Sequence, residues 1–180
     1  ETYLYAFERL VKTTDVKEVI CAYYAYERKP CCGSDKLLIQ ILRNQWGYDG
    51  LVVTDCWAVR DFHTEGCHNL YPNDPASASA LSVRSGADLE CGNSFPALVE
   101  AVQNGILPEE EIDRALLRVL KARFELGEMD PQRKVSWSRI TERLLACDTH
   151  RELALKMARE TMTLLQNNGS VLPLDKNARY

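Results

Sequence analysis

Residues 47–57, GYDGLVVTDCW, carry the clearest structural signal in the sequence. Two glycines frame a turn, the β-favouring run LVVT at 51–54 is too short for a helix, and Asp55 follows at once. In parallel α/β folds, reactive groups collect in the loops beyond the carboxyl ends of the strands. The stretch therefore predicts a buried strand that ends on a carboxylate at the functional edge of a sheet.

Two further runs predict strands on either side of this one, VICAYY at 19–24 and the weaker ADLEC at 87–91. Helices are predicted between the strands, over 35–46 and 77–85, because an apolar stripe or a terminal glycine marks each of them. The strands recur at intervals of about 30 to 35 residues, the length of one βαβ unit, which predicts parallel neighbours. Three such units form an open piece of sheet, whereas a closed (β/α)8 barrel takes about 250 residues, so a larger fold is expected.

Most of the rest of the chain is predicted to be helical, and the apolar periodicity is interrupted once, after residue 130. Apolar periodicity and helix boundary residues predict helices over 4–11, 95–104, 108 onward and 150–166. Residues 131–149 lack such a period and are predicted to be a linker, and Asn168-Gly169-Ser170 is predicted to be a turn. The predicted organisation is an α/β part over 1–130, the linker, and a helix over 150–180 that leads toward a second domain.

Composition excludes several classes of function. The 180 residues carry a formal charge of -4, and no run of Lys and Arg is interleaved with aromatic residues, so no nucleic-acid partner is expected. No apolar run approaches the roughly 20 residues that cross a bilayer, and the first residues lack the marks of a signal peptide. The seven cysteines form no Cys-x-x-Cys pair with partners at zinc spacing, so neither a metal site nor another cofactor is expected.

Asp55 has three interpretations that spacing alone does not separate. It could cap a helix or pair with Arg60, it could bind a cation together with further oxygen ligands, or it could be a nucleophile or acid/base in glycoside hydrolysis. Polar and sulfur side chains at the ends of the neighbouring strands are expected to lie near Asp55 at the carboxyl edge of the sheet: Tyr23, Tyr24, Glu90 and Cys91.

Four blocks of the sequence, in order, resemble glycoside hydrolase family 3. They are CAYYAYERKPCCGSDKLLIQILRNQWGYDGLVVTDCWA, SGADLECG, LVEAVQNGILPEEEIDRALLRVLKARFELGEMDP and HRELALKMARETMTLLQNNGSVLPL. Together they cover nearly the whole chain and include that family's nucleophile signature, a hydrophobic strand that ends in Ser/Thr-Asp. The resemblance implies an α/β fold, the C-terminal part of a (β/α)8 TIM-like barrel, followed by the linker to a second domain.

By this resemblance Asp55 corresponds to the catalytic nucleophile of a retaining β-glycosidase, on the seventh barrel strand. Tyr23 matches the tyrosine of the family's Ser-Tyr-Asn stretch, which lies against the sugar, although Tyr24 replaces the asparagine. Cys56 is typical of the members that act on xylosyl or arabinosyl residues, and a glucosyl or N-acetylglucosaminyl substrate is the alternative, against which Cys56 is only weak evidence. The resemblance also makes Cys56 with Cys91 the only disulfide candidate, with reduced thiols as the favoured state.

The same resemblance implies that much of the enzyme lies outside these 180 residues. The first five barrel strands and the general acid/base have no counterpart here, so the chain alone is expected to be inactive on its expected substrate, an oligosaccharide or aryl glycoside. Exposed barrel edges are expected to cause self-association, or else local disorder over 56–75. A periplasmic or secreted location is implied. The alternative is a non-catalytic module, derived from the same barrel, that binds sugar or a partner.

Overall fold

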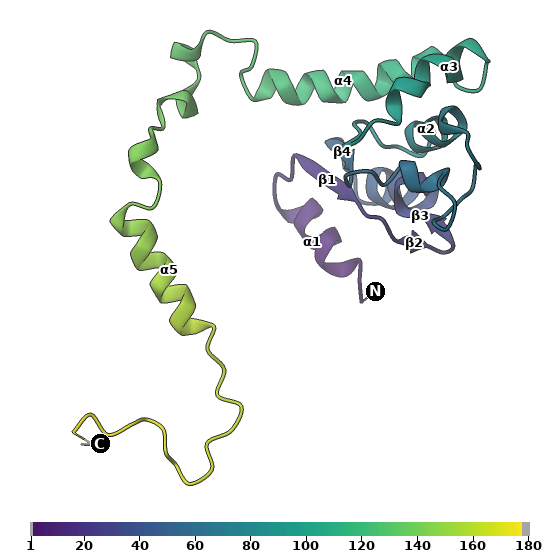
Figure 1. The fold of residues 1–180 in the computed structure, drawn as a ribbon. Coiled ribbons are helices and arrows are strands. Elements are labelled where there is room, and N and C mark those ends of the chain that lie inside the picture. Colours follow the sequence, from purple (N-terminus) through teal and green to yellow (C-terminus); the bar gives the residue numbers. More distant parts are fainter. Residues whose placement is uncertain (1, 178–180) are drawn as a thin grey trace. The chain divides into compact units, whose positions relative to one another are not determined.

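The computed structural model describes residues 2–177, which separate into two units, Glu1–Asp130 and Pro131–Tyr180. The first unit is an α/β structure in which helices pack against a short parallel sheet (Figure 1). Its elements are α1 (Tyr5–Thr13), β1 (Glu18–Cys21), β2 (Ala25–Tyr26), β3 (Lys29–Pro30), η1 (Cys31–Gly33), the π-helix η2 (Lys36–Gln45), β4 (Leu51–Thr54), η3 (Arg60–Phe62), α2 (Pro75–Arg84), η4 (Phe95–Ala97), α3 (Leu98–Gln103) and α4 (Glu109–Glu125).

The sheet confirms the predicted parallel neighbours. β1 pairs with β4 in parallel, from Glu18 opposite Leu51 to Cys21 opposite Thr54, and a parallel bridge joins Val53 to Leu89 on the other side. The three segments therefore lie side by side in the order that successive βαβ units require. Their order places the residues that follow Cys21, Thr54 and Leu89 along one edge of the sheet.

Two predicted strands are shorter than the sequence indicated. The run at 19–24 leaves the sheet after Cys21, because the chain then enters the small hairpin of β2 and β3. The segment 87–91 contributes only the bridge at Leu89. Its backbone is joined to β4 by hydrogen bonds from Asp88 N to Val52 O at 2.8 Å and from Thr54 N to Leu89 O at 2.9 Å, and the Thr54 hydroxyl accepts from Cys91 N at 3.1 Å.

The GYDG turn fixes the entry to β4. Gly47 ends η2 with a φ of +76°, in the left-handed region that glycine adopts without strain. A side chain at Gly50 would come within 2.8 Å of the Lys17 carbonyl oxygen, so only glycine lets the chain pass there. The buried Tyr48 hydroxyl donates to the Leu51 carbonyl at 2.8 Å and closes the turn. The turn thus sets which residue of LVVT meets β1.

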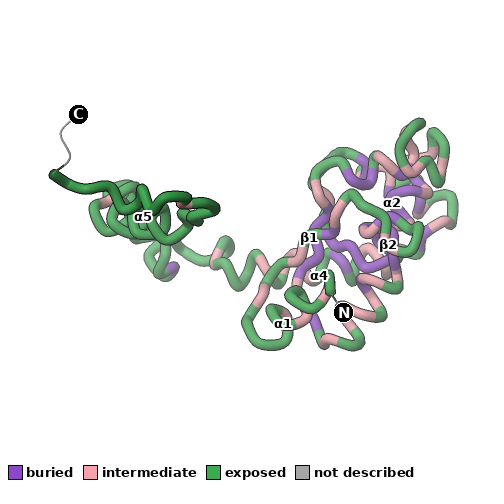
Figure 2. The backbone as a smooth tube through the Cα atoms, turned by 90° about the horizontal axis from the view of Figure 1, so that it is seen from below, coloured by how far each residue is buried: buried purple, intermediate pink, exposed green. Residues whose placement is uncertain are grey.

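Two apolar clusters hold the first unit together, and Figure 2 shows its buried residues around β1, β2 and α2. One cluster joins the sheet to η2 and the loop after β4, with Val52, Val59 and Phe62 almost fully buried. The other joins α2, α3 and α4 around Ala101 and Leu107. The first cluster includes Val52 of β4 and Val59 of the loop that follows Asp55, so it packs against the backbone on both sides of that residue.

A buried ion cluster secures the beginning of β4. The Asp88 carboxylate, whose side chain is 1% exposed, accepts from Arg43 Nη2 at 2.7 Å and from Arg118 Nη1 at 2.9 Å. Arg43 also donates to the backbone carbonyls of Gly50 and Gly86 at 3.1 Å each. Burial lowers the pKa of the Arg43 guanidinium, and the nearby Asp88 charge opposes that shift. The Asp88 carboxylate therefore connects η2 with α4, and Arg43 adds links to the turn before β4 and to the segment before Leu89.

One row of apolar side chains on the sheet remains uncovered at its ends. Ile20, Val53 and Leu89 are aligned across the three strands by register. Val53 is buried, but Ile20 is 61% exposed and Leu89 is 41% exposed. Part of this apolar sheet face is therefore uncovered, and self-association through exposed barrel edges stays a prediction. Residues 56–75 form a hydrogen-bonded loop around η3, including Tyr71 N to Phe62 O at 3.0 Å.

The helices follow the predicted positions with shifted ends. α2 begins at Pro75 because Asp74 caps it, accepting from Ser77 N at 2.9 Å. The predicted helix over 95–104 divides into a 3-10 turn and α3. No described helix has both the length and the hydropathy that a bilayer span needs.

The second unit contains little buried surface, and α5 is exposed throughout. It consists of three 3-10 turns, η5 (Gln132–Lys134), η6 (Ser136–Arg139) and η7 (Glu142–Leu144), followed by α5 (Asp148–Glu160). The helix predicted to reach 166 ends at Glu160, whereas the predicted turn at Asn168-Gly169-Ser170 is present.

Candidate active site

Asp55 stands at the carboxyl edge of the sheet, directly after β4. Its backbone N–H donates to the Cys21 carbonyl at 3.0 Å, which continues the parallel ladder by one residue. The partly exposed carboxylate accepts one hydrogen bond through Oδ1, from Cys56 N at 2.8 Å. Among the described residues it has no ion-pair partner. The backbone is therefore fixed while most of the lone pairs of the carboxylate remain available to a ligand.

The two structural interpretations of Asp55 are wrong. A capping side chain would accept from a backbone N–H two or three residues onward, whereas this carboxylate accepts from the very next residue. Arg60 does not pair with Asp55 but lies over the Trp57 ring, with its guanidinium carbon 5.2 Å from the ring centre. In residues 2–177, no three His, Cys, Asp or Glu side chains gather in a way that could hold a metal ion.

Tyr23 lies just beyond the end of β1, next to the point where Asp55 leaves β4. Cys21 is opposite Thr54 in the register, so Ala22 is level with Asp55. Tyr23 is the next residue along the chain after Ala22. The Tyr23 side chain is 38% exposed, and its hydroxyl makes no hydrogen bond within the described residues. Asp55 and Tyr23 thus share the same edge as predicted, both with unused polar atoms.

Glu90 does not join this group, which corrects the expectation that it faces the mouth. Its carboxylate accepts from Ser94 N at 2.8 Å and from Phe95 N at 2.7 Å. It therefore serves as the cap of the helical segment that begins at η4. Glu90 stands five positions before η4, away from the N-cap position at which sequence patterns mark a cap, so only the structure shows this role.

Two disulfides flank the site. Cys56–Cys91, with Cα atoms 4.4 Å apart, confirms the predicted pair and joins the residue after Asp55 to the segment after Leu89. The expectation of reduced thiols is wrong for this pair, and so is the expectation of a single candidate. Cys21–Cys32, with Cα atoms 5.2 Å apart, closes the loop that carries Tyr23. Both chain segments beside the Asp55 carboxylate are therefore covalently anchored.

Trp57 is a site residue that the sequence did not single out. It has a φ of +69°, which is rare for a bulky side chain, and it is 43% exposed at the same edge. Its backbone N–H donates to the Cys91 carbonyl at 2.7 Å, which holds this conformation. Only its position beside Asp55 could have marked it in the sequence. The indole offers an apolar face of the kind on which sugar rings stack.

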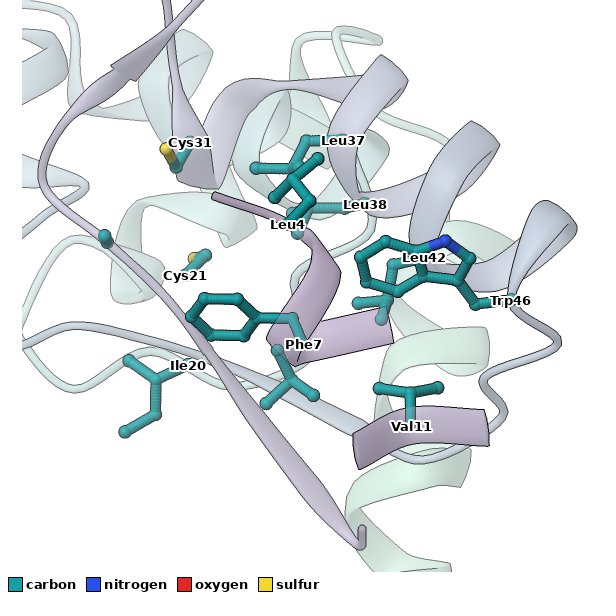
Figure 3. Close-up of a pocket in the computed structure, with 12 residues that line it drawn as sticks. Leu4, Phe7, Val11, Ile20, Cys21, Cys31, Leu37, Leu38, Leu42 and Trp46 are labelled. Carbon is teal, nitrogen blue, oxygen red and sulfur yellow. The ribbon is translucent and has the colours of Figure 1, made fainter. Parts of the chain in front are cut away.

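The apolar cavity in the first unit is not a sugar site. It has a volume of about 170 Å³ and lies between α1, β1 and η2. Figure 3 shows Leu4, Phe7, Leu42 and Trp46 among its lining, with no charged side chain. Because a sugar needs several polar partners and Asp55 does not line this cavity, the carboxyl edge of the sheet is the candidate active site.

The fold and this edge define a parallel α/β domain with a carboxylate at the carboxyl edge of its sheet, and comparison with known proteins identifies its family. Residues 1–122 match the family described as "Glycosyl hydrolase family 3 N terminal domain", so the chain belongs to glycoside hydrolase family 3. A relative from Xylanibacter ruminicola named "Xylan 1,4-beta-xylosidase" is 45% identical over 99% of this chain. "Beta-D-xylosidase 1" from Arabidopsis thaliana is 33% identical over 97% of it.

Solved structures of the family share the fold. A family 3 exo-β-xylosidase in complex with a xylobiose aziridine activity-based probe matches 95% of this chain with a TM-score of 0.84 and 28% identity. A β-glucosidase from Erythrobacter marinus matches 96% with a TM-score of 0.84 and 30% identity. The chain spans about a fifth of the length of these relatives, 21% of the Xylanibacter protein and 22% of the exo-β-xylosidase.

Proposed function

We propose that the protein containing this chain is a retaining, exo-acting β-glycosidase that removes terminal xylosyl or arabinosyl residues, with Asp55 as nucleophile. The observation that carries the proposal is the Asp55 carboxylate itself. It stands at the end of a buried parallel strand, it accepts one hydrogen bond, from Cys56 N, and it has no ion pair within the described residues. A carboxylate held in this way is suited to attack rather than to support the fold.

The proposed architecture is the last three strands of a (β/α)8 barrel. The parallel order of β1, β4 and the Leu89 segment supports it, as does the apolar row that is exposed at Ile20 and Leu89. In such a barrel that row points into the interior, where layers of apolar side chains pack, and the five preceding strands cover it. The catalytic groups then sit at the carboxyl edge, where Asp55 and Tyr23 lie.

In the proposed mechanism an Asp55 oxygen attacks the anomeric carbon as the bond to the leaving oxygen breaks. A general acid elsewhere in the protein protonates that oxygen and then, as its conjugate base, takes a proton from the water that hydrolyses the glycosyl-enzyme. Two displacements retain the anomeric configuration. In this mechanism the Tyr23 hydroxyl, which has no hydrogen-bond partner within the described residues, would donate to Asp55 or to the sugar, and the Trp57 face would supply an apolar wall.

The preference for pentosyl substrates rests on the residue after the nucleophile and on the relatives. Cys56 occupies that position and is tied to Cys91, so the residue directly after the nucleophile contributes a compact disulfide. The Xylanibacter and Arabidopsis relatives are both named xylosidases. Relatives named β-glucosidases share the fold, so a glucosyl substrate is the result that would correct the sugar without changing the chemistry.

The test uses the intact reading frame that contains these residues. Wild type is expected to hydrolyse p-nitrophenyl β-xyloside with initial release of the β-anomer, seen by proton NMR, and Asp55→Asn is expected to lower kcat by at least about 1,000-fold. Asp49→Asn is the matched control, since Asp49 is an exposed acid on the same turn, paired with Lys121. Full activity in Asp55→Asn, or initial release of the α-anomer, would contradict the proposal.

A further inference from the structure

The loop after Asp55 returns to hold the loop that carries Tyr23. His68 Nε2 lies 2.8 Å from the Tyr23 carbonyl oxygen, across 45 residues of sequence. The His68 ring also meets Phe62 edge-on, with centroids 6.2 Å apart and an interplanar angle of 78°. Phe62 is 1% exposed, so the histidine is anchored on the core side and reaches out to the tyrosine backbone.

The hydrogen bond between His68 and Tyr23 can have only one donor. A backbone carbonyl only accepts hydrogen bonds, so His68 Nε2 must carry the proton and donate it to Tyr23. Neutral His68 is then the Nε2–H tautomer, which is a spectroscopic property independent of activity. No hydrogen-bond partner holds the Tyr23 hydroxyl within the described residues, so its position depends on how its backbone is held.

Other contacts restrain the neighbours of Tyr23 but not its own peptide group. The Tyr24 carbonyl accepts from Cys31 N at 2.8 Å, which closes the β2–β3 hairpin. The Cys21–Cys32 disulfide anchors the base of the loop. Tyr23 lies between these two restrained positions. Its own carbonyl is held by His68, which belongs to the loop that follows Asp55.

We propose that His68 is a positioning residue for Tyr23 in the glycosidase site, and this proposal rests on the proposed function. The loop that bears His68 begins at the nucleophile, so this hydrogen bond adds a direct link from that loop to the Tyr23 peptide, beyond the ladder bond from Asp55 N to Cys21 O. Loss of this hydrogen bond frees the tyrosine loop to shift against the nucleophile. A displacement of about 1 Å in a catalytic site can cost up to 100-fold in rate, and loss of a single hydrogen bond costs less.

Two variants in the intact protein separate the hydrogen bond from packing. His68→Gln keeps an N–H at the position of Nε2 but loses the ring, and His68→Phe keeps the ring against Phe62 but loses the donor. If His68 positions Tyr23, kcat/KM for the nitrophenyl xyloside falls about tenfold in His68→Phe and stays within about threefold of wild type in His68→Gln. His150→Phe, on the exposed α5, is the control for the substitution itself.

The opposite order of the two variants, or wild-type kcat/KM in both, would overturn the proposal. A second readout uses the 180-residue chain and does not depend on turnover. The Tyr23 carbonyl carbon is expected to shift upfield in His68→Phe and to recover in His68→Gln, and His68 nitrogen shifts are expected to report the Nε2–H tautomer. If wild type is inactive but these shifts appear, the proposed function fails and the coupling of His68 to Tyr23 stands. A Tyr23 carbonyl insensitive to His68→Phe overturns the coupling itself.

Discussion

Replacement of Asp88 by alanine is expected to destabilise the first unit more than any other single change in its polar network. The carboxylate is 1% exposed and accepts from Arg43, Arg118 and the Val52 N–H. Its removal leaves the Arg43 guanidinium, whose side chain is 9% exposed, without a counter-ion. Breaking a buried pair in this way costs about 3 to 5 kcal/mol.

Two further variants are expected to cost less free energy of unfolding than Asp88→Ala. Asp88→Asn keeps the volume and part of the acceptor capacity, so about 2 kcal/mol is expected from the lost charge. Arg118→Gln removes a partner whose side chain is 32% exposed and leaves the Arg43 pair intact, so about 1 kcal/mol is expected after allowance for solvent screening.

The assay is urea unfolding of the 180-residue chain, followed by far-ultraviolet circular dichroism, with the free energy of unfolding obtained by linear extrapolation. The expected order of destabilisation is Asp88→Ala, then Asp88→Asn, then Arg118→Gln. An Asp88→Ala variant within about 0.5 kcal/mol of wild type would refute the role of the ion cluster, because surface substitutions fall in that range. A larger loss in Arg118→Gln than in Asp88→Ala would also refute it.

Three further results are expected. Burial raises the pKa of Tyr48 to about 12, whereas a phenol in the unfolded chain ionises near pH 10. The stability that the protonated Tyr48 contributes is therefore complete below pH 10 and is lost between pH 10 and 12. Thermal melts of Tyr48→Phe over this alkaline range should lack that loss. The hydrogen bond with Thr149 lowers the pKa of Cys147 and burial raises the pKa of Cys31, so iodoacetamide at pH 8 should alkylate Cys147 first, and the reverse order would refute this. The isolated chain should not turn over p-nitrophenyl β-xyloside, since it supplies one of two carboxylates; measurable turnover, abolished in Asp55→Asn, would refute that.

The main strands were predictable because local signals determine them. LVVT between a glycine turn and a polar residue has few alternatives to a buried strand, and the recurrence of strand and helix predicted parallel pairing. The end of β1 was not predictable in the same way. Tyr23 and Tyr24 favour strands, yet the chain turns away after Cys21 because Cys32 and the hairpin hold it, and those partners are distant in sequence.

The same limit explains the site. Asp55 could be predicted as a site residue because it directly follows a clear strand pattern. The pairing of Cys56 with Cys91 could be predicted only from the family resemblance. Asp88 sits in an apolar segment and its partners lie 30 and 45 residues away, so its role could only be seen in three dimensions. His68 likewise became a candidate only when the fold brought its loop to Tyr23.

The central claim is that Asp55 becomes glycosylated, and an activity-based xylosyl aziridine tests it most directly. The intact protein is treated with the probe, reduced, digested with trypsin and examined by mass spectrometry. One label is expected on the peptide NQWGYDGLVVTDCWAVR, residues 44–60, with fragment ions that place it on Asp55 rather than Asp49. Asp55→Asn is predicted to remain unlabelled. A label on Asp49, a label on another peptide, or equal labelling of Asp55→Asn would contradict the account.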